Sequence, residues 1–253
     1  MTRELVHHVQ DRGVNRVIMD DGANALDLPL LEALKARISS LRADGARPLL
    51  LASAHPNLFC PGWDMKALTG APRERVGEVL SSFNALILEL FSYPGPTAAA
   101  ITGHAVAGGC LLAMACDLRV MATGRPRLGF AELNLGVPVP AASLRMLRSR
   151  LAISALDETV LGGDGCSAER ALQLAMVHQA VSTEKVVIAA DRELRKLGSK
   201  PPKAYAATKE FLFKDAWQMM AGANPAEDEI FLDCWFDAAA RDRIQDVARS
   251  LGQ

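Results

Sequence analysis

The stretch ITGHAVAGGCLLAMACDLRV, residues 101–120, decides the fold, because a strand end, two glycines and an apolar helix follow one another in it. A glycine inside a helix costs about 1 kcal/mol relative to alanine, so Gly108 and Gly109 need a reason. At a helix N-terminus the backbone N–H groups lack intrahelical partners, and the helix dipole favours negative charge there. The two glycines therefore indicate either a site for an anion or a developing oxyanion, or simply tight packing of the helix on a strand.

Strand and helix patterns alternate on both sides of this stretch. Short apolar or alternating runs predict strands at 14–20, 47–53, 97–103, 117–123 and 178–182, and a short strand or turn at 127–133. Helical spacing predicts long helices at 27–45, with Asp27 as the N-cap, and at 73–93. After residue 184 only helical patterns occur. The chain is therefore expected to be an α/β domain with mostly parallel strands, followed by a helical region.

Composition narrows the possible functions. The 28 basic and 29 acidic residues balance, which argues against a nucleic-acid-binding surface. The five cysteines are scattered without a CxxC pair, and no His, Asp or Glu cluster has the spacing of metal ligands, so we expect no metal site. The polar N-terminus and the lack of a long apolar run predict a cytoplasmic protein that does not enter the membrane.

Two further segments carry candidate chemistry. In NLFCPGWDMKAL, residues 57–68, a strand end and a Pro-Gly turn precede a helix start at Asp64, so its N–H groups could converge with those of Gly108, although an ordinary capped loop has the same pattern. In LGFAELNLGV, residues 128–137, Glu132 stands among apolar residues. Apolar surroundings disfavour the charged carboxylate and raise its pKa, which suits a base near neutrality, while a glutamate pointing to solvent remains the alternative.

Four motifs together resemble those of the enoyl-CoA hydratase/isomerase family, the crotonase superfamily. They are NALD from residue 24, FCPGWD from 59, GHAVAGGCLLAMACDLRV from 103 and LGFAELNLGV from 128, and their order and spacing match along the whole chain. The resemblance implies a crotonase-like spiral of ββα units. It implies a core at residues 1–190 that binds acyl-CoA, and a C-terminal helical region at 191–253 that assembles the chain into a homotrimer or a dimer of trimers.

The resemblance also implies roles for individual residues. The catalytic groups would be Glu132 as the acid and base, with the backbone N–H groups of Trp63 and Gly108 holding the thioester oxygen. The substrate pocket would include Gly109, Leu111 and Leu133. Coenzyme A would enter as part of the substrate, with no permanently bound cofactor, and would be contacted by Asn24, Ala25, Leu26, Gly62, Asp64, Met65 and Lys66.

Leu111 distinguishes branches of the family. Hydratases of this family carry a second glutamate at the position that matches Leu111, whereas the Δ3,Δ2-enoyl-CoA isomerase branch works with a single one, as here with Glu132. The tail ARDRIQDVARSL also resembles the isomerase branch. The resemblance therefore predicts an isomerase of fatty-acid β-oxidation.

Other functions remain open on the same scaffold. They are hydration or another crotonase-type reaction, with His104, Asp157 or Glu158 supplying a second polar group, and non-catalytic acyl-CoA binding. In the tail, Phe211, Phe213 and Trp217 are expected to pack between helices, to close the acyl pocket or to meet a neighbouring subunit. Lys209 is expected to be solvated or to approach a coenzyme A phosphate.

Overall fold

The strands form two sheets that wind around each other, as the computed structural model shows for residues 4–222 and 224–250. The six-stranded sheet has the order β1-β2-β3-β5-β7-β9, and all its neighbours are parallel except β1 and β2. Its strands are β1 (Val6–Asp11), β2 (Val14–Met19), β3 (Leu49–Ser53), β5 (Thr97–Ile101), β7 (Leu118–Ala122) and β9 (Gln179–Val181). The three-stranded parallel sheet consists of β4 (Leu58–Cys60), β6 (His104–Val106) and β8 (Leu128–Gly129).

The chain forms a spiral of repeats, and each repeat contributes one strand to the large sheet, one strand to the small sheet and then one or two helices. Strands β3, β5 and β7 enter the large sheet, and β4, β6 and β8, which follow them in turn, build the small one. The helices that complete the repeats are α2 (Met65–Leu68) with α3 (Arg73–Phe91), α4 (Gly108–Ala115) and α5 (Glu132–Leu135). The predicted spiral of ββα units is therefore confirmed, and it brings the ends of β4, β6 and β8 to one place.

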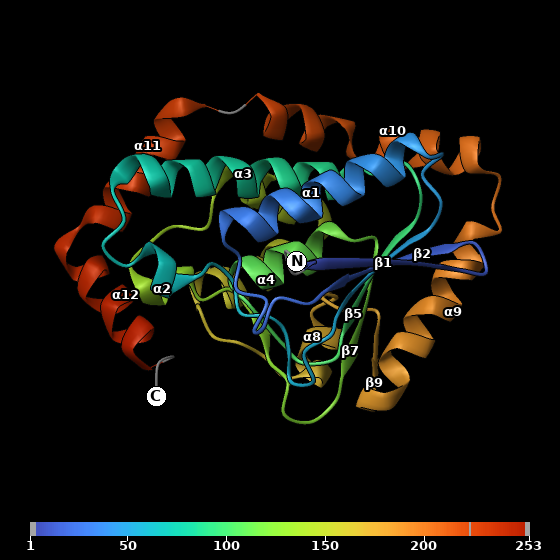
Figure 1. Ribbon diagram of the computed structural model, residues 1–253, viewed down its shortest axis with the longest axis horizontal. Helices are drawn as coiled ribbons and strands as arrows, with labels where there is room; N and C mark the ends of the chain where they lie inside the picture. Colours follow the sequence, from blue (N-terminus) through green and yellow to red (C-terminus); the bar gives the residue numbers. More distant parts are fainter. Residues whose placement is uncertain (1–3, 223, 251–253) are drawn as a thin grey trace.

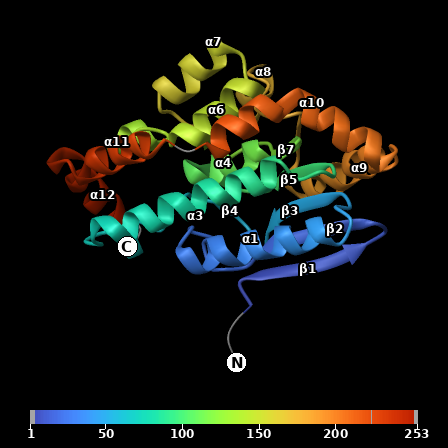
Figure 2. The ribbon, with the colours of Figure 1, turned by 90° about the horizontal axis from the view of Figure 1, so that it is seen from above.

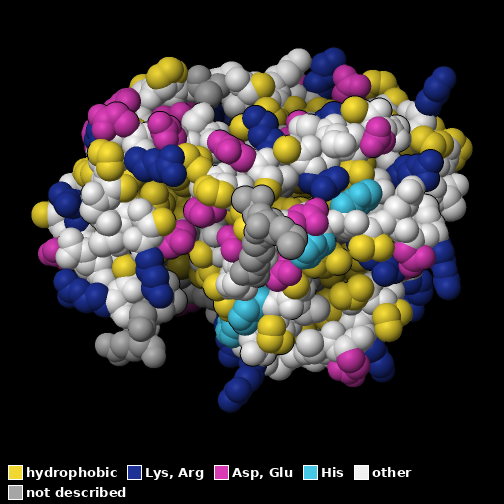
Figure 3. Space-filling view, viewed as in Figure 1, with side chains coloured by type: hydrophobic (Ala, Val, Ile, Leu, Met, Phe, Trp, Pro, Cys, Tyr) yellow, Lys and Arg dark blue, Asp and Glu magenta, His cyan; other side chains and the backbone are white. Residues whose placement is uncertain are grey.

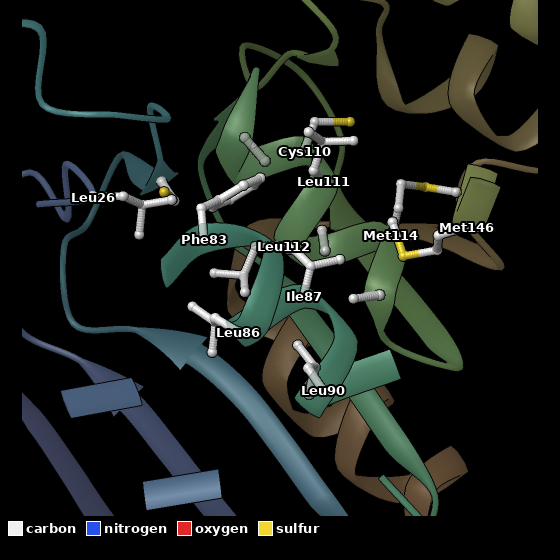
Figure 4. Packing of buried hydrophobic residues seen from close by; sticks show 14 of the residues in the cluster. Leu26, Phe83, Leu86, Ile87, Leu90, Cys110, Leu111, Leu112, Met114 and Met146 are labelled. Atoms are coloured by element: carbon white, nitrogen blue, oxygen red, sulfur yellow. The ribbon is translucent and has the colours of Figure 1, made fainter. Parts of the chain in front are cut away.

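Helices cover both faces of the large sheet (Figure 1). On one face α1 (Leu28–Ala43) packs against α3, and the main hydrophobic core lies between these helices, α4 and the strands. Figure 4 shows Phe83, Leu86, Ile87 and Leu90 of α3 beside Leu111 and Leu112 of α4. On the other face α9 (Val186–Gly198) covers β3, β5 and β7 with a smaller apolar cluster. The helix α4 is thus buried on all sides, which explains its uniformly apolar sequence.

The remaining helices are α6 (Ala141–Arg150), α7 (Ile153–Leu156) with the π-helical turn Asp157–Leu161, α8 (Ala168–Gln173), the 3-10 turn Thr183–Lys185, α10 (Pro202–Ala221), α11 (Pro225–Phe236) and α12 (Ala238–Ser250). Of these, α6 and α10 pack over α3, and α11 and α12 lie at one end of the molecule (Figure 2). Helix α10 packs on α6 and α3, whereas α11 packs on α3, and α12 packs on α2 and α5. The C-terminal helices therefore return to the end of the spiral where α2, α4 and α5 begin.

Two details differ from the sequence-based expectation. The strand β1 was not predicted, because the pattern VHHVQD is too polar to stand out, yet it pairs antiparallel with β2 along its whole length. The predicted boundary between residues 190 and 191 falls inside α9, which packs on the large sheet, so the division into two parts stays a prediction.

Candidate functional site

The loop after β4 places the Trp63 backbone beside the segment 24–26. Gly62 has φ +97°, a conformation that glycine adopts without strain. Trp63 then forms a parallel bridge with Leu26, in which the Leu26 N–H donates to the Gly62 carbonyl (2.8 Å) and the Asp64 N–H donates to the Leu26 carbonyl (3.0 Å). In a parallel bridge of this kind the amide of the middle residue points away from the partner. The Trp63 N–H is therefore directed away from Leu26.

The turn from β6 into α4 brings a second amide to the same place. Ala107 has φ 49° and ψ −123°, a strained conformation for a residue with a side chain. The first helical hydrogen bond runs from the Leu111 N–H to the Ala107 carbonyl (3.0 Å), so the Gly108 N–H precedes the ladder of α4. A Cβ atom built on Gly62 would lie 3.2 Å from the Gly108 nitrogen. The two loops are thus in contact, as the convergence of Trp63 and Gly108 requires.

The two adjacent glycines have different tasks. A Cβ on Gly109 would lie 2.0 Å from the Cys60 carbonyl oxygen, so this glycine lets α4 pack directly on β4. A Cβ on Gly108 would meet the side chains of Trp63 at 3.2 Å and Phe83 at 3.4 Å, and the Gly62 Cα atom only at an ordinary contact distance of 3.5 Å. Gly108 therefore faces the side-chain-lined space next to the loops, and only Gly109 fits the packing explanation.

That space is a small apolar cavity of about 30 Å³. Its walls are Trp63, Met65, Phe83, Ala107, Gly108, Leu111, Glu132, Leu135, Val137, Pro140, Phe231 and Trp235. Among these, Glu132 alone has an ionisable side chain. The cavity is thus lined by residues of both loops, Trp63 and Gly108, by one residue with a carboxyl group, and otherwise by apolar residues.

Glu132 is held in a buried position at the first residue of α5. Its side chain is 6% exposed, and its Oε2 atom has no hydrogen-bond partner among the described residues. Burial raises the pKa of Glu132 to about 7, against the smaller opposing effect of backbone hydrogen bonds from Glu132 and Ala131. A carboxyl group with that pKa exchanges a proton readily near neutral pH, as an acid–base catalyst must.

The raised pKa gives a prediction about stability that does not depend on activity. Between the ordinary pKa of 4.5 and about 7 the folded protein binds a proton that the unfolded chain lacks, so the free energy of unfolding falls as the pH rises through this range. The Glu132→Gln variant has no carboxyl group at this position, so its free energy of unfolding should not fall in this way as the pH rises. The gain in unfolding free energy should be larger at pH 8 than at pH 5 by about 3 kcal/mol, measured by urea denaturation at both pH values.

The control for this experiment is Glu158→Gln. The pKa of the exposed Glu158 carboxyl is lowered by its hydrogen bond with Arg170, so this variant should show no gain at pH 8. A Glu132→Gln variant with the same stability difference at both pH values would contradict the burial of a titrating carboxyl group.

Of the three residues predicted for the substrate pocket, one lines the cavity and two lie outside it. Leu111 is completely buried and lines the cavity, as predicted. Gly109 does not line it, because it packs on Cys60. Leu133 is 39% exposed and lies outside it, since α5 turns this side chain away; Leu135 and Val137 line the cavity in its place. Leu133, which the resemblance implied for the substrate pocket, thus lies outside this cavity because α5 begins at residue 132.

The two segments predicted to contact coenzyme A lie side by side through the Leu26–Trp63 bridge. Asn24 is buried, and its side-chain amide donates to Ser53 Oγ (2.8 Å) and to the Phe59 carbonyl (3.3 Å), which fixes the turn before Leu26. Asp64 caps α2 by accepting from the Ala67 N–H, and Lys66 is exposed beside it. Contact of these segments with coenzyme A stays a prediction.

The groups considered as a second polar partner lie elsewhere. His104 Nδ1 accepts from the Arg127 N–H, Glu158 pairs with Arg170, and Asp157 lines a separate surface pocket with Arg148. None of the three lines the cavity at Glu132.

Of the three aromatic residues considered in the helical tail, two pack against another helix and one is exposed. Phe211 is 82% exposed, whereas Phe213 and Trp217 pack on Phe91 at ring distances of 5.1 and 6.0 Å. None of these lines the cavity; Phe231 and Trp235 of α11 do, and sequence reasoning missed them because the helical pattern of 225–236 does not show which face meets the core.

Lys209 was predicted to be solvated or near a phosphate, but it is 4% exposed. Its Nζ donates to Asp117 Oδ2 at 2.7 Å, so burial next to a carboxylate explains its position.

The described residues contain no group of His, Cys, Asp and Glu side chains placed to hold a metal ion, and no helix among them is long and apolar enough to cross a membrane. Acidic and basic side chains are interspersed over the face seen in Figure 3.

Comparisons with known proteins agree with this geometry. Residues 10–241 match the model of the family described as enoyl-CoA hydratase/isomerase. A Bacillus subtilis protein named a probable enoyl-CoA hydratase is 28% identical over 225 residues, which cover 88% of this chain and 87% of that protein. A Mycobacterium tuberculosis protein whose apo structure is described as that of an enoyl-CoA isomerase is similar with a TM-score of 0.81 and 28% identity, covering 90% of this chain and 97% of that one; a crystal structure of the same protein is described as that of a probable enoyl-CoA hydratase. The human mitochondrial Δ3-Δ2-enoyl-CoA isomerase has the same fold, with a TM-score of 0.93, 24% identity and 98% of both chains covered.

Proposed function

The chain belongs to the enoyl-CoA hydratase/isomerase family, and from this premise we propose that it moves the double bond of a 3-enoyl-CoA to the 2-position. The observation that carries the proposal is the cavity at Glu132, where one carboxyl group with a pKa of about 7 is enclosed by apolar side chains. The match over residues 10–241 supports an enzyme of the enoyl-CoA hydratase/isomerase family. That its reaction is isomerisation is our proposal.

In the proposed mechanism the ionised Glu132 removes a proton from C2 of the 3-enoyl thioester. The electron pair of the broken C–H bond moves into the conjugated system, and negative charge develops on the thioester oxygen. The N–H groups of Trp63 and Gly108 stabilise this dienolate oxygen, with the N-terminus of α4 adding a favourable dipole. The protonated Glu132 then donates the same proton to C4, which yields the 2-enoyl thioester and restores the carboxylate.

The apolar wall favours isomerisation over hydration. Adding water across a double bond requires a group that activates the water and a second group that positions or donates a proton. Leu111 occupies the wall where the family's hydratases carry their other glutamate, and no other described cavity residue has an ionisable side chain. Hydration is nevertheless the second candidate, because a relative with 28% identity is named a probable hydratase.

Three further properties complete the proposal. Coenzyme A is part of the substrate, bound along Asn24–Leu26 and Gly62–Lys66. The chain assembles as a homotrimer or a dimer of trimers through its helical tail, where α10 exposes Phe211, Leu212 and Met219. From the sequence, we place the protein in the cytoplasm.

A paired assay tests the reaction. The purified protein is given a 3-enoyl-CoA in one cuvette and a 2-enoyl-CoA in another, and the absorbance of the conjugated thioester is followed. Isomerisation and hydration change this absorbance in opposite directions, so the two candidates are separated in one experiment.

A further inference from the structure

Four aromatic side chains line the cavity beside Glu132, those of Trp63, Phe83, Phe231 and Trp235. Phe231 and Trp235 stand one turn apart on α11 and are 4% and 3% exposed. Their ring centroids lie 5.4 and 5.6 Å from the Trp63 ring, and 6.2 Å from each other. Phe83 of α3 meets Trp63 edge-on at 5.8 Å. The wall is therefore a packed aromatic cluster rather than an open channel.

The space inside this wall is small. A water molecule requires about 10–15 Å³ on the same measure, so the cavity of about 30 Å³ has room for about two. A methylene group is similar in size to a water molecule. A space of this size holds only a few carbons beside Glu132, so a long acyl tail needs further space beyond it.

Helix α11 is held over the cavity by more than its aromatic residues. Arg73, at the start of α3, pairs with Glu229 and Asp233, and Arg145 of α6 pairs with Glu227 at 2.8 Å. A long acyl tail would have to displace the helix and expose the buried Phe231 and Trp235 side chains to water, which is unfavourable.

We propose that Phe231 and Trp235, packed against Trp63, restrict the site to thioesters of short acyl groups. The inference rests on the proposed function, because the substrate is taken to be an acyl-CoA thioester. The limit on acyl length concerns binding of that thioester and can be measured without the isomerase reaction. Trp235 has the largest side chain on α11 and lines both this cavity and an adjoining pocket, so removing its ring enlarges the space available to an acyl group.

The test compares hexanoyl-CoA with dodecanoyl-CoA in calorimetric binding, and 3-hexenoyl-CoA with 3-dodecenoyl-CoA in kcat/KM. The unmodified protein should bind and convert the short compound roughly 100-fold better. In Trp235→Ala this preference should fall below about tenfold, because the long compound gains relative to the short one. Phe231→Leu, a milder change in the same wall, should reduce the preference in the same direction.

Trp217→Ala is the matched control, since Trp217 packs on Phe91 outside the cavity, and it should keep the full chain-length preference. Equal binding of both lengths by the unmodified protein, or an unchanged preference in Trp235→Ala and Phe231→Leu, would overturn the inference. Binding that prefers the short thioester without any isomerisation would instead support the inference and refute the proposed reaction.

Discussion

Glu132→Gln is expected to reduce kcat for 3-enoyl-CoA isomerisation by about 10³-fold or more, at the upper part of the range for general acid–base catalysis. The same group removes the proton at C2 and returns it at C4, so its loss affects both steps. Glutamine has nearly the same shape and can accept the backbone hydrogen bonds that Glu132 receives, so the fold and substrate binding should persist. Initial rates of the absorbance increase, with KM determined separately, measure this effect.

Leu111→Met provides the comparison for this variant. Methionine keeps the volume and apolar character of a residue that is completely buried, and such exchanges usually cost little stability. Its rate should stay within about tenfold of the unmodified protein. If Leu111→Met lost as much activity as Glu132→Gln, the cavity shape rather than the carboxyl group would control the reaction, and the proposed mechanism would be wrong.

Gly108→Pro should lower kcat by about 10²- to 10³-fold, the effect of removing one donor to a developing oxyanion. Proline lacks the N–H group, and it is favoured at the first position of a helix, where that group has no intrahelical partner. Gly108 is the first residue of α4, so the change removes the donor while the helix can still form. KM should change less than kcat, because the oxygen carries its full negative charge only during the reaction.

The control for the backbone donor is Gly108→Ala, which keeps the N–H. Its Cβ would lie 3.2 Å from Trp63 and 3.4 Å from Phe83, contacts that side chains relieve by small shifts. This variant should retain most of its kcat, with thermal melting confirming that both proteins are folded. Equal losses in the alanine and proline variants would show that bulk, not the missing donor, causes the effect.

The order of strands and helices could be predicted from the sequence because each ββα unit carries its own local signals. Gly45 after a helical pattern, Pro94 after another and the apolar run 108–116 all mark real element boundaries. The cap residues Asp27 and Asp64 were also predictable, since each accepts from the N–H three residues on. What local patterns could not provide is the pairing of β1, which depends on β2 being in place.

The site was only partly predictable for a similar reason. Glu132 and Leu111 lie in segments whose motifs are continuous, so the sequence placed them together, and the structure puts both on the cavity wall. Phe231 and Trp235 come from a helix about 100 residues later along the chain, and their position depends on how α11 packs on α3. Leu133 shows the opposite error, because a shift from strand to helix at residue 132 turns the next side chain outward.

The central claim is that one buried carboxyl group shuttles a proton and adds no water. The paired assay addresses it most directly, with a short 3-enoyl-CoA such as 3-hexenoyl-CoA and the matching 2-enoyl-CoA as separate substrates. We predict a rise in conjugated-thioester absorbance with the first and no loss of absorbance with the second. Loss of absorbance with the 2-enoyl-CoA would mean that water is added at a rate comparable to isomerisation, and would contradict the single-glutamate account.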